Sequence, residues 1–345
     1  MPERQWMTIM SLARLGRIAA IACVLPLALF ASPAPGKDKE KDSWPVKGEL
    51  IGKDGRKSRD VSGIACTTRK GFPRACLVID DNLQGAQFVE VRDGKLVAGD
   101  TIKLIKNKSL ELDGEGVAFS RGFYYVIGSH GHPRDSDRKL DPAKHAELIR
   151  ARIAASSKIV RFRAVDGTAA KNEQTSNLRK AIADEPDLVP FLDRRLDENG
   201  LTIEGIAIKD ATLFAGFRAP VLDNNGRAVV LSVPIDALFG SSAMQRRLFR
   251  LALGQGRGVR DLASFETGIL ILAGPAAAEP GVYAIYAWDG ASENVRLLSE
   301  LTQFAPKRKP EGLLPLDKVG TKLRVLILFD GDKEGTPTPV TVPAP

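Results

Sequence analysis

Short apolar runs of strand length recur in pairs along this chain, and the first run of each pair starts with a similar four-residue pattern. The five patterns are SGIA at Ser62, EGVA at Glu115, EGIA at Glu204, RDLA at Arg260 and EGLL at Glu311. After a short polar turn comes a second apolar run: CLVIDD, YYVIGSHG, LFAGFRAP, ILILAGP or VLILFDGD. The pattern starts are 53, 89, 56 and 51 residues apart, which indicates a repeating unit of about 50 residues.

Asp-Gly pairs mark further strands inside these units. The runs FVEVRDG, RFRAVDG and AIYAWDG each end in Asp-Gly, which is a strong signal for a hairpin turn. A unit of about 50 residues with four strands is typical of a β-propeller. We therefore predict an all-β fold, a β-propeller of five four-stranded blades. A sixth blade built from inserted residues stays open as an alternative.

The second unit is longer than the others because it carries two insertions, near residues 133–155 and 170–199. They contain the strongly helical stretches DPAKHAELIRARIAASS and NLRKAIADEPDLVPFLDRRL, so we predict helical insertions in the second blade. The last unit is short, with room for only one strand after Asp330, near residues 339–342. We expect residues 46–51 to supply its missing outer strand and so to close the ring.

Residues 1–34 have the pattern of a signal peptide. The segment has positive charges at Arg4, Arg14 and Arg17, followed by an apolar run over residues 18–30. This run is too short to span a bilayer and fits the apolar region of a signal sequence. A buried N-terminal helix is the alternative. We expect the mature chain to be exported, to the periplasm or out of the cell, without a transmembrane anchor.

Composition narrows the candidate partners. We assign residues 35–45 to a solvated linker and residues 46–345 to a single β-propeller domain. Hydrophobic residues make up 43% and charged residues 27% of the chain, as in ordinary globular proteins. Aromatic residues are only 6%, few for a protein that stacks single-stranded bases, so we expect no nucleic-acid partner. The formal net charge of +8 suits a small polar or anionic ligand, and we expect a monomer.

Export makes the cysteine pair Cys66 and Cys76 informative. Both lie five residues from Gly71, which is at the centre of a turn between two strand-like runs. In a hairpin about Gly71 they face each other, near enough for a disulfide, and an oxidising compartment favours one. Two buried thiols are the alternative.

The repeated motifs resemble a known family. The segments DGEGVAF…YYVIGSHG, LTIEGIAI…LFAGFRAP, GRGVRDLA…ILILAGP and KPEGLLPL…VLILFDG are similar to the bacterial family called domain of unknown function 3616. The resemblance covers nearly the whole mature chain and implies a propeller-like, exported protein, with no activity assigned. The E-G-I-A strand start also resembles, over a short stretch, the secreted esterase-like phytase propellers, and this implies no catalytic residue.

Propeller geometry gathers charged residues at one rim of the central channel. The repeated pattern opens the innermost strand, and the second strand returns to the same rim. The residues placed there are Ser62, Glu115, Glu204, Arg260 and Glu311, together with Asp80, Asp81, Ser129, His130, Arg218, Asp261 and Asp330. Both helical insertions use connections on this rim, so we expect both to overhang the same mouth. A charged ring under a lid indicates a site for a polar ligand.

We assign roles at this rim by residue type. Glu115, Glu204 and Glu311 are candidate metal ligands, because carboxylates suit a hard cation such as Ca²⁺. His130 and Glu204 are the candidate catalytic residues, with His130 as acid or base. The candidate ligand-binding residues are Glu115, Arg218, Arg260, Asp261, Glu311, Asp80, Asp81, Ser129 and Asp330. In the alternative interpretation, the repeated Glu residues only hydrogen-bond backbone amides of the neighbouring blade.

Two functions from different classes follow. The first is a metal-assisted hydrolase of a phosphate ester or lactone, in which rim carboxylates hold a cation and arginines neutralise an anionic group. The second is a non-catalytic envelope module that binds a ligand or partner at the same mouth. Whether the protein is an enzyme, and which ligand it binds, does not follow from the sequence.

Overall fold

The computed structural model describes residues 42–106, 110–134, 140–165, 168–169 and 171–345. The expected signal peptide at residues 1–34 and most of the expected linker therefore lie outside the described residues, as does the Asp-Gly pair at 166–167. Among the residues described, no helix is both long enough and apolar enough to cross a membrane.

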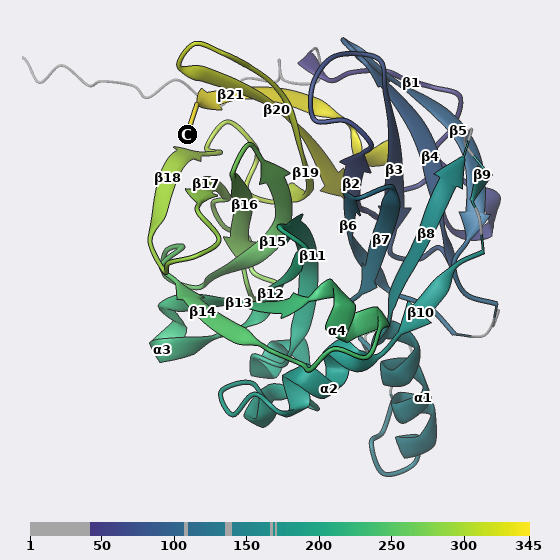
Figure 1. The fold of residues 1–345 in the computed structure, drawn as a ribbon, viewed down its shortest axis with the longest axis vertical. Coiled ribbons are helices and arrows are strands. Elements are labelled where there is room, and N and C mark those ends of the chain that lie inside the picture. The colour runs from purple at the N-terminus through teal and green to yellow at the C-terminus, as the bar shows by residue number, and fades with distance from the viewer. Residues whose placement is uncertain (1–41, 107–109, 135–139, 166–167, 170) are drawn as a thin grey trace, which may run out of the picture. The chain divides into compact units, whose positions relative to one another are not determined.

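Five sheets follow one another along the chain, and they are antiparallel except for one short parallel strand at the edge of the first (Figure 1). The first contains β2 (Val61–Cys66), β3 (Arg74–Asp80), β4 (Gly85–Arg92) and β5 (Lys95–Lys103). The second contains β6 (Gly114–Ser120), β7 (Phe123–Gly128), β8 (Ile159–Val165) and β10 (Glu173–Thr175), with β9 (Thr168–Ala169) paired to β8. The third contains β11 (Thr202–Lys209), β12 (Thr212–Val221), β13 (Arg227–Pro234) and β14 (Arg247–Leu251). The fourth contains β15 (Arg257–Phe265), β16 (Gly268–Pro275), β17 (Ala284–Trp288) and β18 (Val295–Glu300). The fifth contains β19 (Lys309–Val319), β20 (Lys322–Asp330) and β21 (Thr338–Pro343).

The sheets form a closed ring, so the prediction of a five-bladed β-propeller is confirmed. The innermost strands β2, β6, β11, β15 and β19 contact one another in this order, and β19 also contacts β2. Apolar faces of neighbouring blades pack together, as where the Phe214 ring of the third blade meets the Trp288 ring of the fourth edge to face, 5.5 Å between centroids. A Cβ atom at Gly205 would lie 2.6 Å from the Cα of Asp261 in the next blade. The repeated Gly therefore allows adjacent innermost strands to approach closely.

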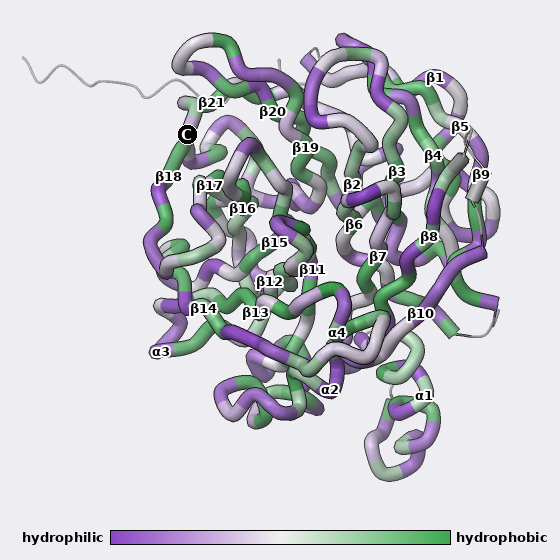
Figure 2. The backbone as a smooth tube through the Cα atoms, viewed as in Figure 1, coloured by the Kyte–Doolittle hydropathy of each residue, from purple (hydrophilic) through white to green (hydrophobic). Residues whose placement is uncertain are grey.

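Both predicted helical insertions are present in the second blade. Helix α1 (Ala146–Ser156) lies between β7 and β8, and α2 (Asn177–Ala183) lies between β10 and β11. In Figure 1 both lie along the lower edge of the ring. The remaining short helical elements are 3-10 turns at Lys53–Gly55, Val189–Phe191, Leu196–Glu198 and Lys333–Gly335, and helices α3 (Leu222–Asn225) and α4 (Ile235–Phe239). Figure 2 shows hydrophobic residues along the strands and hydrophilic ones at the connections entering β10 and β14.

The N-terminal strand does not complete the last blade, so this prediction is wrong. Strand β1 (Val46–Lys47) pairs in parallel with β5 at the edge of the first blade, and the last blade has three strands among the described residues. The segment still joins the two blades through single hydrogen bonds. The Trp44 N–H donates to the Pro337 carbonyl (2.7 Å), and the Leu50 N–H donates to Glu334 Oε1 (3.1 Å). Hydrogen bonding and packing across the seam thus take the place of a shared sheet.

The first hairpin carries the cross-link. Cys66 in β2 and Cys76 in β3 stand directly opposite each other and are joined by a disulfide. The loop between them lies at the far end of β2 from Ser62. The disulfide therefore marks the end of the channel that is remote from the predicted site.

Candidate functional site

One irregularity recurs in the innermost strand of all five blades. The pairing of each innermost strand with its neighbour skips one residue, the pattern of a β-bulge. The skipped residues are those that begin the repeated pattern: Ser62, Glu115, Glu204, Arg260 and Glu311. All five are buried. Because a bulge re-aims the side chain of its extra residue, each blade delivers one side chain to this end of the channel, which we call the acidic mouth.

Two arginines neutralise two of the three glutamates at the acidic mouth. Arg218 in β12 donates from Nη1 to Glu204 Oε1 at 2.8 Å. Arg260 places Nε 3.1 Å from Glu204 Oε2, and its Nη2 contacts Glu311 Oε1. Arg218 is tied further by a hydrogen bond from Nε to the Ala276 carbonyl at 2.9 Å. The structure therefore brings these four predicted residues together, as a buried network of ion pairs.

The arginines fix the protonation state of Glu204. Burial raises the pKa of this carboxyl, but the charges of Arg260 and Arg218 outweigh burial and lower it below the usual value. Glu204 is therefore ionised at neutral pH and has no proton to donate. Its geometry is that of a counter-ion between two guanidinium groups and gives no support to a catalytic role.

The third glutamate lies in a different environment. Glu115 is 2% exposed, and its Oε1 has no hydrogen-bond partner among the described residues. One carboxylate oxygen each of Asp81, Asp113 and Glu115 lie within 4.8 Å of one another; we call this group the acidic triad. Burial raises the pKa of Glu115 well above its ordinary value, and the charges of Glu204, Asp113 and Asp81 add to the effect. Burial likewise raises the pKa values of Asp81 and Asp113. Such a group is stabilised by sharing protons or by a bound cation.

The predicted metal-ligand set also converges, since Glu115, Glu204 and Glu311 place one oxygen each within 4.8 Å. Two of these three carboxylates, however, already contact Arg260. A cation placed among them would be repelled by that buried guanidinium. The acidic triad shares only Glu115 with the predicted set. The charge of Arg134 also acts on its three carboxylates, but among the described residues no arginine forms an ion pair with them, so the triad is the better place for a cation.

A cavity of about 170 Å³ opens beside the acidic triad. Its lining includes Asp81 and Asp113 of the triad, Arg134 in the segment after β7, and Arg152 and Ser156 of α1. Burial lowers the pKa of Arg134, but the surrounding carboxylates, led by Glu115, outweigh it and raise the pKa. Arg134 therefore stays charged at the cavity. Helix α1 forms part of the wall, as expected for an insertion that overhangs the mouth.

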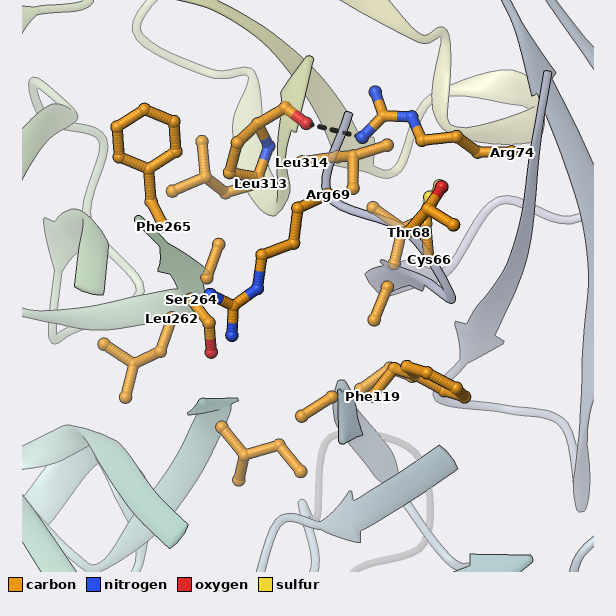
Figure 3. Close-up of a pocket in the computed structure, with 17 residues that line it drawn as sticks. Cys66, Thr68, Arg69, Arg74, Phe119, Leu262, Ser264, Phe265, Leu313 and Leu314 are labelled. Atoms are coloured by element: carbon orange, nitrogen blue, oxygen red, sulfur yellow. Dashed lines mark hydrogen bonds between the residues drawn. The ribbon is translucent and has the colours of Figure 1, made fainter. Parts of the chain in front are cut away.

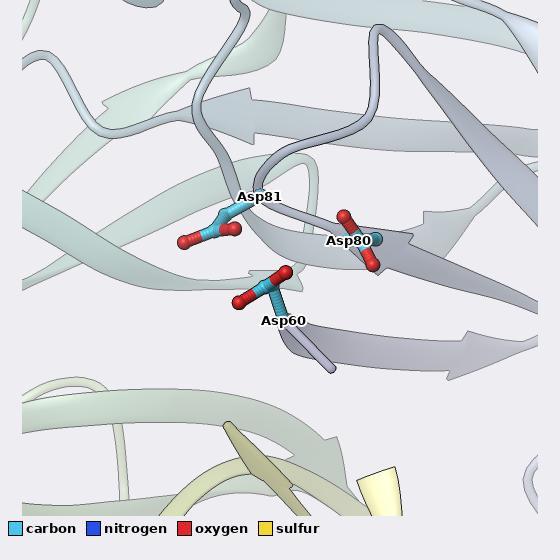
Figure 4. A group of neighbouring side chains, drawn as sticks. All are labelled: Asp60, Asp80 and Asp81. Carbon is cyan, nitrogen blue, oxygen red and sulfur yellow. The ribbon is translucent and has the colours of Figure 1, made fainter. Parts of the chain in front are cut away.

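A second group of carboxylates adjoins the triad through Asp81. Asp60, Asp80 and Asp81 also place one oxygen each within 4.8 Å of one another (Figure 4). Asp80 is held by local hydrogen bonds, because Ser58 Oγ donates to its Oδ2 (2.5 Å) and the Asn82 N–H donates to its Oδ1 (3.1 Å). Burial nevertheless raises the pKa of Asp80 to about 6. Negative charge is thus concentrated on the first- and second-blade side of the mouth.

Asp261 serves the structure of the ring. It occupies the position where other blades have Gly, and its carboxylate accepts hydrogen bonds from the backbone N–H of Leu262 (2.7 Å) and of Leu313 in the next blade (2.8 Å). This is the blade-joining role that the sequence offered as the alternative for the repeated Glu residues. The geometry gives no support to a ligand-binding role for Asp261.

Two further predicted ligand-binding residues are engaged by neighbouring protein groups. Asp330 accepts a contact from Lys309 Nζ at 2.7 Å. The hydroxyl of Ser129 accepts a hydrogen bond from the Gly131 N–H at 3.2 Å. Neither Asp330 nor Ser129 lines the cavity.

His130 is fully buried and does not line the cavity. Its Nδ1 lies 2.9 Å from the Gly128 carbonyl oxygen, and Arg179 of α2 donates to the carbonyl of His130 at 2.6 Å. Burial lowers the pKa of its imidazole to about 3. A neutral ring enclosed by the protein and away from the cavity gives no support to His130 as an acid or base.

Sequence reasoning missed Asp60, Asp113, Arg134 and Arg152. A signal for the first two was present, because each stands two residues before the bulged position of its unit, in DVSG and DGEG. Arg134 and Arg152 come from the inserted segment, which has no counterpart in the other units. No periodicity could have pointed to them.

The fold and site define a five-bladed β-propeller with a buried, charged channel mouth. The chain belongs to the family described as Protein of unknown function (DUF3616), which matches residues 77–160 and 146–339. No curated protein matches the chain in sequence.

Several solved structures share the fold loosely. The exo-β-1,3-galactanase of Phanerochaete chrysosporium with galactose has 9% identity and a TM-score of 0.44, over 87% of this chain and 62% of that one. A GH43 endo-arabinanase from Bacillus licheniformis has 10% identity and a TM-score of 0.35, over 86% and 95%. A putative 6-phosphogluconolactonase from Bacteroides uniformis has 12% identity and a TM-score of 0.31, over 78% and 68%. This chain thus spans less than two thirds of the galactanase chain, and likenesses of this order carry no argument about function.

Proposed function

We propose that this protein is an exported β-propeller that binds a small polar or anionic ligand at the acidic mouth with the help of a divalent cation, best matched by Ca²⁺. The observation that carries the proposal is the acidic triad, in which Asp81 and Asp113 line a cavity and the buried Glu115 has an unpartnered oxygen within 4.8 Å of theirs. Two oxygens that share a Ca²⁺ ion at about 2.4 Å each lie no more than about 4.8 Å apart. The triad oxygens meet this limit.

Electrostatics favours the acidic triad with a bound cation over the triad without one. Without a cation, burial raises the pKa values of Asp81, Asp113 and Glu115; neighbouring carboxylates add to this rise and the charge of Arg134 opposes it. Ca²⁺ accepts six to eight oxygen ligands, including water, so carboxylates at the edge of a cavity leave positions for a ligand. The bound ion would replace the protons and remove the repulsion.

The cavity supports a small ligand with an anionic group. Its volume of about 170 Å³ is room for roughly six water molecules, at the ~30 Å³ that each occupies in the liquid. Arg134 and Arg152 line it together with the carboxylates. An anionic group would be held between the cation and these guanidinium groups, which suit phosphate or carboxylate oxygens.

For the hydrolase form of this function, the reaction class is attack of water on a phosphate ester or lactone. A hard cation polarises the phosphoryl or carbonyl oxygen, and a carboxylate whose pKa is raised accepts the proton of the attacking water. Asp81, whose pKa is raised and which lines the cavity, meets this requirement better than His130 or Glu204. A non-catalytic envelope binding module is the second candidate, favoured because the described lining of the cavity holds no His, Cys or Lys.

The deciding experiment is calorimetric titration of the metal-free protein with Ca²⁺, with the melting temperature measured in parallel. Asp113→Asn and Glu115→Gln should each weaken Ca²⁺ binding by at least about tenfold. Asp210→Asn is the matched control, because this carboxylate is 88% exposed in the β11–β12 turn and should leave binding unchanged. If Ca²⁺ does not bind the wild type, or if all three variants bind alike, the proposal is wrong.

Two additional measurements separate the candidate functions. Ca²⁺-dependent hydrolysis of p-nitrophenyl phosphate or of a simple lactone, lost in Glu115→Gln, would identify an enzyme. Binding of these compounds without turnover would identify a binding module. Cell fractionation tests export, with the mature protein expected in the periplasm or the medium.

A further inference from the structure

The end of the channel opposite the acidic mouth is surrounded by hairpins, which join the first strand of each blade to the second and the third to the fourth. A small cavity of about 60 Å³ lies there, lined by residues of all five innermost strands. Arg69, in the disulfide-closed loop of the first blade, extends toward Ser264 of the fourth blade (Figure 3) and donates to the Glu266 carbonyl at 3.0 Å. We call the surface formed by these hairpins the far face, because it faces away from the acidic mouth.

Charge is unevenly distributed over the far face. Four hairpins of the fifth, first and second blades together contain seven Lys or Arg and two Asp. We call them the basic arc: residues 67–73, 92–95, 120–123 and 317–322. The short turns of the third and fourth blades contain one Lys and four Asp or Glu. These turns are residues 209–212, 265–268 and 288–295. The positive charge of the far face is therefore concentrated on three adjacent blades.

Arg324 of β20 pairs with both acids of the basic arc. Its Nη1 lies 2.8 Å from Asp93 Oδ1, and its Nε donates to Asp317 Oδ1 at 3.1 Å. Asp93 belongs to the first blade and Asp317 to the fifth, so the same contacts hold these hairpins together. The acids of the arc are thus already neutralised by a residue outside it.

Most of the basic residues in the arc are open to solvent. Six of the seven are exposed, namely Arg69, Lys70, Arg92, Arg121, Lys318 and Lys322. Two of these six have acidic neighbours, since Lys318 pairs with Glu266 at 3.2 Å and Arg92 pairs with Glu90. Lys70, Arg121 and Lys322 form no ion pair with any described residue. A net positive charge on this surface is therefore left for a partner.

An exposed apolar side chain lies within the basic arc. Val319 is 76% exposed, more than any other large hydrophobic residue in the described part of the chain. It ends β19, the longest described strand, and stands opposite Lys322 at the start of β20. Lys318 precedes it. The tip of this hairpin therefore presents one apolar group between two ammonium groups, and lysine stems can lie along apolar surface while their charges contact phosphate.

We propose that the basic arc binds the surface of an anionic phospholipid bilayer, with the side chain of Val319 inserted among the headgroups. About four to eight clustered Lys or Arg residues are typical of sites for anionic lipids, and each cation near the surface adds to the affinity. Two features favour a bilayer over a soluble anion. The charge is spread over hairpins at one end of the ring, and it flanks an exposed apolar side chain. Bound in this way, the protein would hold the acidic mouth away from the bilayer and open to its ligand.

The test is co-sedimentation with vesicles in the presence of EDTA, so that no calcium bridge contributes. It uses residues 40–345, which form one compact unit, because the apolar run at residues 18–30 would itself bind lipid. Vesicles of phosphatidylglycerol and phosphatidylcholine at about 3:7 should bind at least about tenfold more tightly than phosphatidylcholine alone. Raising NaCl from about 0.1 M to about 1 M should weaken binding, because the Debye length falls from about 10 Å to about 3 Å.

Two double variants of equal charge locate the surface. Lys70→Gln with Lys322→Gln removes two exposed charges of the basic arc and should weaken binding to the anionic vesicles by about tenfold or more. The matched control is Lys53→Gln with Lys307→Gln. These two lysines are also exposed but lie in the segments that lead into β2 and β19, at the acidic-mouth end. The control should bind within about twofold of the wild type.

A third variant tests insertion of the hairpin tip. Val319→Ser keeps every charge and should weaken binding to the anionic vesicles about threefold or more, because less apolar area leaves water. Dextran sulfate serves as a soluble anionic polymer in a separate arm, and Val319→Ser should not affect its binding.

Three results would overturn the proposal: no binding to the anionic vesicles, equal binding by the two double variants, or wild-type binding by Val319→Ser. Tighter binding of dextran sulfate than of the vesicles would also overturn it and would assign the arc to an anionic polymer. Because EDTA removes calcium throughout, the outcome does not depend on that of the calcium titration at the acidic mouth.

Discussion

The two ends of the channel are built from the same five strands but differ in how they acquire charge. At the acidic mouth, charged or polar side chains come from equivalent bulged positions in every blade, and three of these are glutamates. At the opposite end of the channel, the third residue of each repeated pattern lines a cavity and is apolar, and the charged lining residues Arg69 and Arg74 both come from one hairpin of the first blade. Repetition thus gathers like charges that need compensation, whereas a single loop adds charge locally. This difference implies that the polar character of the acidic mouth depends on all five blades, whereas the charge that lines the opposite end of the channel depends on residues of the first blade.

The largest effect is expected from breaking the ion-pair network. Arg260→Met leaves Glu204 and Glu311 with one buried guanidinium fewer, and should lower the free energy of unfolding by about 3–5 kcal/mol. Urea unfolding measures this loss. Arg74→Met at the opposite end of the channel should cost much less, because the Arg74 guanidinium donates to the Pro315 carbonyl and no carboxylate loses an ion-pair partner there. An equal loss of unfolding free energy in the two variants would show that the two ends do not differ in this respect.

Removal of the disulfide is the next largest. The double substitution Cys66→Ser, Cys76→Ser should lower the free energy of unfolding by about 2–3 kcal/mol, as expected for a closed loop of this short length. Because the cross-link lies at the end of the channel opposite the acidic mouth, Ca²⁺ affinity in calorimetry should stay at the wild-type value. A loss of Ca²⁺ binding in this variant would show that the two ends are coupled.

A smaller effect is expected at the link between the fourth and fifth blades. Asp261→Gly restores the residue that most blades have at this position but removes the acceptor for the backbone N–H groups of Leu262 and Leu313. The free energy of unfolding should fall by about 1–2 kcal/mol, and amide hydrogen exchange at Leu313 should speed up. Unchanged exchange at Leu313 would argue against the inter-blade bond.

The smallest effect is a pH dependence at the acidic mouth. Burial raises the pKa of Asp80 to about 6, so between pH 6 and about 4 the folded protein holds a proton that the unfolded chain releases. The wild type should therefore gain stability relative to Asp80→Asn as the pH falls from 7 to 4, by less than about 1.4 kcal/mol per pH unit. Paired urea unfolding curves at pH 7 and 4.5 measure the difference. A difference that does not change with pH would contradict the raised pKa.

Much of the fold followed from the repeated pattern, because strand length, turn chemistry and spacing are local properties. The five patterns located the five innermost strands, and the stretches of helix-forming sequence located α1 and α2. The N-terminal strand was misplaced because its partner is decided by tertiary contacts. Val46–Lys47 is too short for its own residues to select between the edge of the first blade and that of the last.

The candidate site was predictable only in part. The convergence of Glu115, Glu204 and Glu311 follows from ring symmetry, and the structure shows it. The counter-ions of each glutamate depend on rotamers and bulges that the sequence does not display. Pairing of Arg260 with both Glu204 and Glu311 is therefore what moves the candidate cation site to the acidic triad.

The repeated bulge has a consequence for how this scaffold can change. Since the extra residue arises from backbone pairing, the ring accommodates Ser, Glu or Arg at that point without altering its strands, as Ser62, Glu204 and Arg260 demonstrate. The five bulged positions surround one axis, and each can hold a different residue type without a change in the fold. Substitutions at these five positions would change the chemistry of the mouth while the architecture stays fixed. The identities of the five bulged residues therefore indicate which kind of ligand a propeller of this design can bind.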